Sequence, residues 1–156
     1  MSDTQFYVFF APAALPTMPT NILWFLWASV ASKQKLCIHI VEDDEGIRDS
    51  TSLLLETLGF QIRAFSSAIE YLNSPPTGAA DCLLVDIHMP HMTGVELLEL
   101  LRSRGVNTPV IIMTGNGAHL KRRVLLARNC AVLVKPFEES ELLAKIAEGC
   151  ARVNGH

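Results

Sequence analysis

Side chains able to carry out chemistry occur at four points where an apolar run of the sequence ends. These points are Glu42-Asp43-Asp44, Asp86, Thr114-Gly115 and Lys135-Pro136. If the fold gathers them, the carboxylates repel each other unless a cation joins them, and an all-oxygen ligand set favours Mg²⁺. A carboxylate can also attack phosphorus and form an acyl phosphate. The metal and Lys135 would then balance the charge of the phosphoryl oxygens, and Thr114 could donate a hydrogen bond to one of them.

Each of these residues also has an ordinary structural explanation. An Asp at the end of a strand commonly serves in a turn or a helix cap. Thr114 before Gly115 could form a turn, and Lys135 before Pro136 could be a solvated loop lysine. The functional interpretation therefore depends on whether one fold brings all four strand ends together.

The elements that must position these residues alternate along the chain. Apolar or alternating runs predict strands at Leu36–Val41, Phe60–Phe65, Cys82–Val85, Pro109–Met113 and Ala131–Val134. Helical spacing or capping-box pairs (Ser67 with Glu70, Thr93 with Glu96) predict helices between them. The helices are expected from Ile47 to Leu58 before Gly59, after Ser67, after Thr93, around His119–Arg128 and over Glu139–Val153. In the first helix Ile47, Thr51, Leu54 and Leu58 recur at helical spacing, and in the last Leu142, Leu143, Ile146 and Cys150 are expected to face inward.

The alternation predicts an α/β fold with a doubly wound, five-stranded parallel sheet. The central strands are almost wholly apolar, which is typical of parallel strands covered by helices on both faces. In such a sheet, ligands bind outside the carboxyl ends of the strands, near the point where the strand order reverses. That is where the four sets of polar residues lie, so we expect one site.

Four segments resemble the motifs of response-regulator receiver (CheY-like) domains, in particular those of FixJ/NarL-like two-component regulators. They are Val41–Arg48, Leu84–Gly94, Ile111–Gly115 and Val134–Phe137. The resemblance covers Leu36–Val153. It implies a flavodoxin-like (βα)5 fold with strand order 2-1-3-4-5, formed by residues 36–153.

The resemblance implies a role for each acidic residue. Asp86 would accept a phosphoryl group from a sensor histidine kinase. Asp43 and Asp86 would bind Mg²⁺ directly and Glu42 through water, while the backbone carbonyl of His88 would add a ligand. Asp44 would cap the following helix.

The phosphoryl group would contact Thr114 and Lys135, and the domain would catalyse only its own phosphorylation and dephosphorylation. Receivers usually carry an aromatic switch residue three positions before the lysine, and here that position is Val132. Arg128–Ala131 also stands in place of a glycine-containing turn. Both departures fall near the fourth helix and fifth strand. This is the face through which two copies of the domain could form a homodimer.

Composition limits the remaining choices. A chain of 156 residues suits one domain, and a net charge of −3 argues against direct binding of nucleic acid. Four cysteines without CxxC spacing favour a reduced, cytoplasmic setting, with Cys82 as a buried apolar residue. Residues 1–35 are interpreted as a poorly ordered or adventitious extension. A membrane or partner contact by this segment stays an alternative, although membrane contact is not what we expect.

Two alternatives to a phosphorylation switch acting through protein contacts stay open. The chain could be the receiver fragment of a DNA-binding transcription regulator, or a phosphorylation-independent adaptor with the same fold. A haloacid-dehalogenase-like phosphatase is disfavoured because its Asp-x-Asp after the first strand is absent. A transition-metal site at His88 and His91 is disfavoured because further ligands at suitable spacing are missing.

Overall fold

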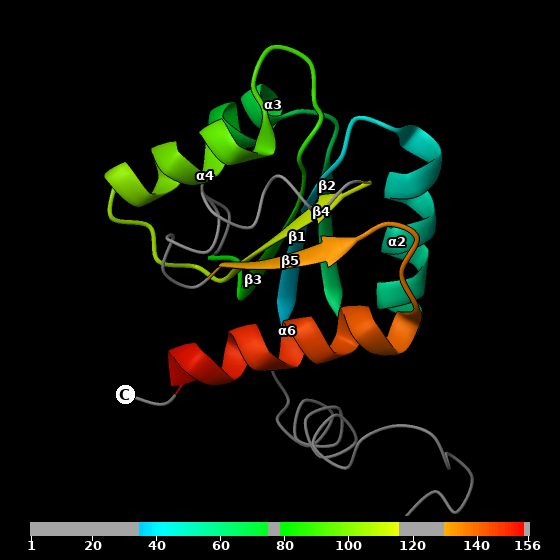
Figure 1. Cartoon of the computed structure of the whole chain (residues 1–156). Helices are drawn as coiled ribbons and strands as arrows, with labels where there is room; N and C mark the ends of the chain where they lie inside the picture. Colours follow the sequence, from blue (N-terminus) through cyan, green and yellow to red (C-terminus); the bar gives the residue numbers. More distant parts are fainter. Residues whose placement is uncertain (1–34, 75–78, 116–129, 155–156) are drawn as a thin grey trace, which may run out of the picture.

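The computed structural model describes residues 35–74, 79–115 and 130–154, and these form a parallel sheet with helices on both faces (Figure 1). The sheet has five strands in the order β2-β1-β3-β4-β5. The strands are β1 (Cys37–Val41), β2 (Gln61–Phe65), β3 (Cys82–Asp86), β4 (Val110–Thr114) and β5 (Cys130–Val134). The predicted fold class and strand order are confirmed.

Four described helices cover the sheet. They are α2 (Glu45–Thr57), α3 (Ala68–Asn73), α4 (Gly94–Ser103) and α6 (Glu139–Asn154). One apolar cluster joins α2 and α6 to one face, and a second joins α3 and α4 to the other. Figure 1 shows the same two layers of helices. The helix expected around residues 119–128 lies outside the described residues.

The order of the strands places the site residues on one edge. Every strand pairing is parallel, so all carboxyl ends point the same way. The order reverses between β1 and β3, which are adjacent although β2 lies between them in sequence. Chain segments that leave β1 and β3 therefore diverge to opposite faces, and the space between their ends is open to side chains.

Local sequence signals explain where the helices start and stop. Asp44 is the N-cap of α2, and Thr93 with Glu96 forms the expected capping box of α4. Ser67 caps α3 as expected, but the Glu70 carboxylate accepts hydrogen bonds from Ser66 rather than from the cap residue. The α2 helix ends before Gly59, whose φ of 93° lies in the positive-φ region that glycine adopts more easily than other residues.

The core follows the predicted pattern with one shift. On α6, the four side chains expected to face inward are all buried: Leu142, Leu143, Ile146 and Cys150. Cys82 is also buried, as expected. On α2, the fully buried leucine is Leu55, which the sequence pattern did not include, whereas Leu54 is only partly buried.

None of the helices in the described part of the chain is long and apolar enough to cross a membrane. Residues 1–34 lie outside the described residues, so the interpretation of the N-terminal extension stays a prediction.

Candidate functional site

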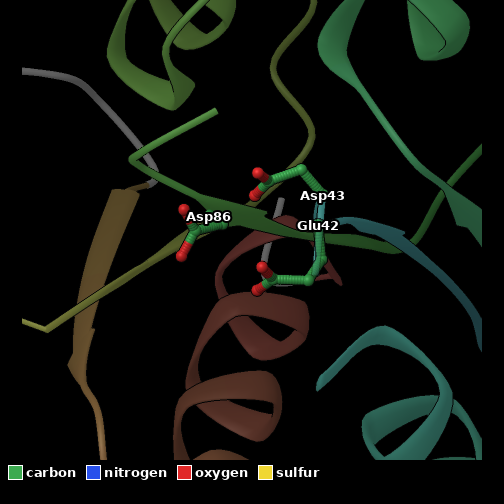
Figure 2. A group of neighbouring side chains, drawn as sticks. All are labelled: Glu42, Asp43 and Asp86. Atoms are coloured by element: carbon green, nitrogen blue, oxygen red, sulfur yellow. The ribbon is translucent and has the colours of Figure 1, made fainter. Parts of the chain in front are cut away.

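Three carboxylates gather at the carboxyl edge of the sheet (Figure 2). One oxygen from each of Glu42, Asp43 and Asp86 lies within 4.8 Å of the others. Glu42 and Asp43 follow β1 directly, and Asp86 is the last residue of the neighbouring β3. Glu42 and Asp86 are 2% and 6% exposed, whereas Asp43 faces solvent. Two buried negative charges this close require a positive partner.

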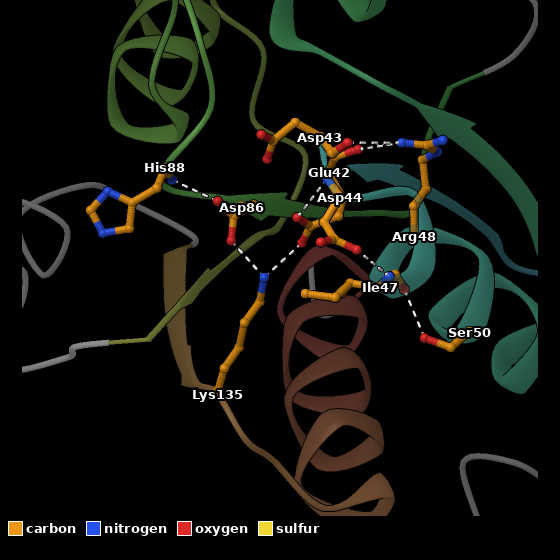
Figure 3. Close-up of polar contacts among 9 residues, drawn as sticks. All are labelled: Glu42, Asp43, Asp44, Ile47, Arg48, Ser50, Asp86, His88 and Lys135. Carbon is orange, nitrogen blue, oxygen red and sulfur yellow. Dashed lines mark hydrogen bonds and ion pairs between the residues drawn. The ribbon is translucent and has the colours of Figure 1, made fainter.

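Lys135 supplies that partner within the protein (Figure 3). Its Nζ lies 2.7 Å from Glu42 Oε2 and 2.6 Å from Asp86 Oδ1. Burial alone lowers the pKa of Lys135, but the hydrogen bonds to Asp86 and Glu42 outweigh burial and raise this pKa. Burial also raises the pKa of Glu42, and the contact with Lys135 opposes that increase. Lys135 therefore stays a cation between two carboxylates.

The Asp86 carboxylate is fixed from a second side. Its Oδ2 accepts a 2.6 Å hydrogen bond from the His88 backbone N–H, so both oxygens have partners. The His88 imidazole is exposed and points away from the carboxylates (Figure 3), so it offers no ligand to this cluster. The backbone behind Asp86 is also crowded, because a Cβ on Gly94 would lie 2.3 Å from the Asp86 carbonyl oxygen.

The loop that carries the acidic pair is held by two neighbouring elements, β2 and α2. Glu42 N–H donates to the Phe65 carbonyl at the end of β2. The Asp44 side chain accepts from the Ile47 N–H and caps α2, which leaves Glu42 and Asp43 as the acids that face Asp86. The Arg48 guanidinium donates to the carbonyls of both Glu42 and Asp43.

Thr114 and Val132 occupy the neighbouring strands. Thr114 ends β4 with no exposed surface, and its carbonyl accepts a 2.7 Å hydrogen bond from the Lys135 N–H. This bond continues the pairing of β4 with β5 and places the lysine at the cluster. Val132 packs partly buried against the cluster of α3 and α4. The structure thus brings Glu42, Asp43, Asp86 and Lys135 together, with Thr114 on the strand beside them.

Two residues of this site were not recognised from the sequence. Gly94 lies in the motif after Asp86, but its contact with the Asp86 backbone depends on how α4 packs over β3. Arg48 lies on the first turns of a helix, where the sequence pattern alone indicates a solvated charge. The only feature of the sequence that points to its bond with the Glu42 carbonyl is the spacing of six residues between them.

The donor set fits a hard divalent cation. All three side chains offer carboxylate oxygens, two of them buried, and neither thiol nor imidazole enters the cluster among the described residues. Mg²⁺ is bound in proteins by one or two carboxylates together with water and phosphate oxygens. Glu42, Asp43 and Asp86 would hold it.

Comparison with known proteins agrees with this fold. Residues 38–147 match the family described as the response regulator receiver domain. The transcriptional regulatory protein FixJ of Azorhizobium caulinodans is 31% identical over 120 residues, which cover 76% of this chain and 57% of that protein. The chain therefore belongs to the response regulator receiver family.

Solved structures give the same result. The crystal structure of FixJ-N is 29% identical, with a TM-score of 0.68, and the match covers 76% of this chain and 95% of that one. A CheY-like receiver domain from Methanospirillum hungatei JF-1 is also 29% identical, with a TM-score of 0.71 over 78% of this chain and 98% of that one. Receiver domains are signalling modules of two-component systems, in which they interact with histidine kinases. The chain spans about half the length of the curated relatives that it matches.

Proposed function

We propose that Asp86 accepts a phosphoryl group from a sensor histidine kinase in an Mg²⁺-dependent reaction, and that the modification switches protein contacts. The observation that carries this proposal is the contact of Lys135 with both Asp86 and Glu42, beside the exposed carboxylate of Asp43. A nucleophile, a fixed cation and an oxygen ligand set for a metal meet at one edge of the sheet.

In the proposed reaction an Asp86 carboxylate oxygen forms a bond to phosphorus while the bond from phosphorus to the kinase imidazole nitrogen breaks. The electron pair of the broken bond stays on that nitrogen. The other ring nitrogen of the phosphohistidine carries a proton, so the kinase histidine leaves as neutral imidazole rather than as imidazolate. The Lys135 ammonium stays charged and contacts the phosphoryl oxygens, and we assign a further hydrogen bond to Thr114. Mg²⁺ held by Asp43, Asp86 and, through water, Glu42, with the His88 carbonyl as a further ligand, would supply positive charge against these oxygens.

The kinase must reach Asp86 from solvent, and an open groove lies beside the site. It is lined by Ile47, Ser50, Thr51 and Leu54 of α2 and by Lys135, Pro136 and Phe137 after β5. Its walls are mainly apolar, and Lys135 contacts Asp86 from this side. We infer that the kinase domain packs against this groove during transfer.

The test uses acetyl phosphate and beryllofluoride with Mg²⁺. We expect the wild type to form an alkali-labile phosphoprotein, as an acyl phosphate should be, and to bind beryllofluoride, and Asp86→Asn to do neither. Asp49→Asn removes an acid from α2 outside the cluster and should behave like the wild type. Equal labelling of Asp86→Asn and the wild type would show that another residue accepts the group.

A phosphorylation-independent adaptor is the second candidate, because Val132 replaces the aromatic switch residue and packs against the core. It requires equal affinity for the output partner with and without beryllofluoride.

We assign the output contact to β5, an edge strand on which Val134 is 41% exposed, and a homodimer is one form of that contact. For the phosphorylation switch, we also propose a cytoplasmic location and attachment to a DNA-binding output domain, as in a transcription regulator of FixJ type.

A further inference from the structure

We propose that Arg48 is a positioning residue for the cation site, because its guanidinium holds the backbone that presents Glu42 and Asp43. This inference rests on the proposed function, which assigns Mg²⁺ to that site. Arg48 touches neither the Asp86 carboxylate nor Lys135 in the contacts drawn in Figure 3. Its effect would pass through the loop between β1 and α2.

The geometry is a single donor atom shared by two carbonyls. Arg48 Nη1 lies 2.9 Å from the Glu42 carbonyl oxygen and 3.4 Å from the Asp43 carbonyl oxygen. The first distance is that of a good hydrogen bond and the second is a weak contact. Arg48 is itself fixed, because its backbone N–H donates to the Asp44 carbonyl at the start of α2. The helix thus holds the loop through a partly buried side chain.

Asp43 depends on this contact more than Glu42 does. The Glu42 side chain is buried and bound to Lys135, and its N–H is bound to β2. Asp43 is exposed, so its carboxylate is placed mainly by the conformation of its own backbone. Loss of the Arg48 contact would leave the Asp43 peptide freer to rotate, and ligand oxygens that must first be ordered bind a metal more weakly.

Charge alone predicts the opposite effect, which makes the inference testable. An arginine cation bound to the loop that carries two of the carboxylates repels a second cation. If Arg48 acted only through its charge, its removal would strengthen Mg²⁺ binding. If Arg48 acts by holding the loop, its removal weakens Mg²⁺ binding although a repulsive charge has gone. The sign of the change in affinity therefore separates the two roles.

The experiment measures the Mg²⁺ dissociation constant by calorimetry and the free energy of unfolding by urea denaturation. We expect Arg48→Gln to weaken Mg²⁺ binding by about tenfold, the lower end of the effect of outer hydrogen bonds on metal affinity. Arg48→Lys keeps one donor group and should recover part of the loss. If Arg48→Gln does not fold, the comparison of Arg48→Lys with the wild type gives the sign.

The chain offers a matched control in Arg102. This arginine also reaches from a helix to two loop carbonyls, those of Val106 at 2.7 Å and Thr108 at 3.0 Å, but on α4 at the amino-terminal side of β4. Arg102→Gln should lower the free energy of unfolding and leave Mg²⁺ affinity unchanged. Mg²⁺ binding by Arg48→Gln that equals or exceeds that of the wild type would overturn the inference. A wild type that binds no Mg²⁺ would instead contradict the proposed function.

Discussion

At the scale of single residues, the position of Asp86 depends on a neighbour without a side chain. Gly94 begins α4 and donates its N–H to the Ile87 carbonyl. A Cβ at this position would lie 2.3 Å from the Asp86 carbonyl oxygen and 2.9 Å from Val85 Cγ1. Real Cβ atoms do not come this close to backbone oxygen, so either α4 or the end of β3 must move.

We expect Gly94→Ala to destabilise the fold by about 1–3 kcal/mol, the usual cost of overpacking a core. Because the displaced backbone carries Asp86, phosphorylation by acetyl phosphate should also slow. Gly115→Ala is the control, since a Cβ on Gly115 meets nothing within 4 Å. Urea denaturation and the rate of phosphoprotein formation measure the two effects. A Gly94→Ala variant as stable and as fast as the wild type would show that α4 shifts without cost.

The carboxylates and the lysine of the site could be predicted from the sequence because these residues follow apolar strands. The parallel sheet explains why residues at the ends of such strands meet. The same approach could not find the contact of Gly94 or the bond from Arg48 to Glu42. Both depend on the distance between a helix and a strand end, which side-chain packing sets. The inward face of α2 shows the same limit: Leu55 rather than Leu54 is fully buried, and adjacent leucines give no signal that separates them.

At the scale of elements, α2 has two separate roles. Its first turns hold the acidic loop through Asp44 and Arg48. One side of it, with Ile47, Ser50, Thr51 and Leu54, forms one wall of the groove beside Lys135. A change to the wall that leaves the first role intact would separate binding of the kinase from the chemistry at Asp86.

Ser50→Tyr is such a change, because Ser50 is exposed on α2 and lines the groove. We expect phosphotransfer from the kinase to slow by about tenfold or more, which corresponds to roughly 1.4 kcal/mol of lost interaction. Phosphorylation by acetyl phosphate should stay unchanged, because this small donor needs no docking surface. Glu56→Tyr places the same side chain at an exposed position of α2 that does not line the groove. If both variants accept the phosphoryl group from the kinase at the wild-type rate, the groove is not the docking surface.

At the scale of the whole molecule, a buried histidine links stability to pH. His39 in β1 is 5% exposed and contacts the rings of Phe65 and Tyr71. Neither ring nitrogen has a hydrogen-bond partner. Burial lowers the pKa of His39, the charge of Arg63 lowers it further, and the charge of Asp81 opposes both effects.

The sign of the pH effect follows from this lowered pKa. Below the ordinary histidine pKa of about 6.5, the unfolded chain binds a proton that the folded protein still excludes, so stability falls as pH falls. We expect the free energy of unfolding to decrease between pH 7.5 and 5.5, by at most about 1.4 kcal/mol per pH unit from this residue. His39→Leu keeps an apolar contact and should show a smaller decrease. Parallel curves for the two proteins, measured by urea denaturation, would mean that His39 is not the group responsible.

The ion pair between Glu42 and Lys135 joins residues that are 93 positions apart, and this has a consequence for synthesis of the protein. Glu42 and Asp86 both emerge from the ribosome before the residue that neutralises them, because Lys135 directly follows the last strand. That strand lies at the edge of the sheet and can join after the other four have paired. A nascent chain can therefore build most of its core while its acceptor carboxylate still lacks the lysine, and the site becomes complete only with the final strand.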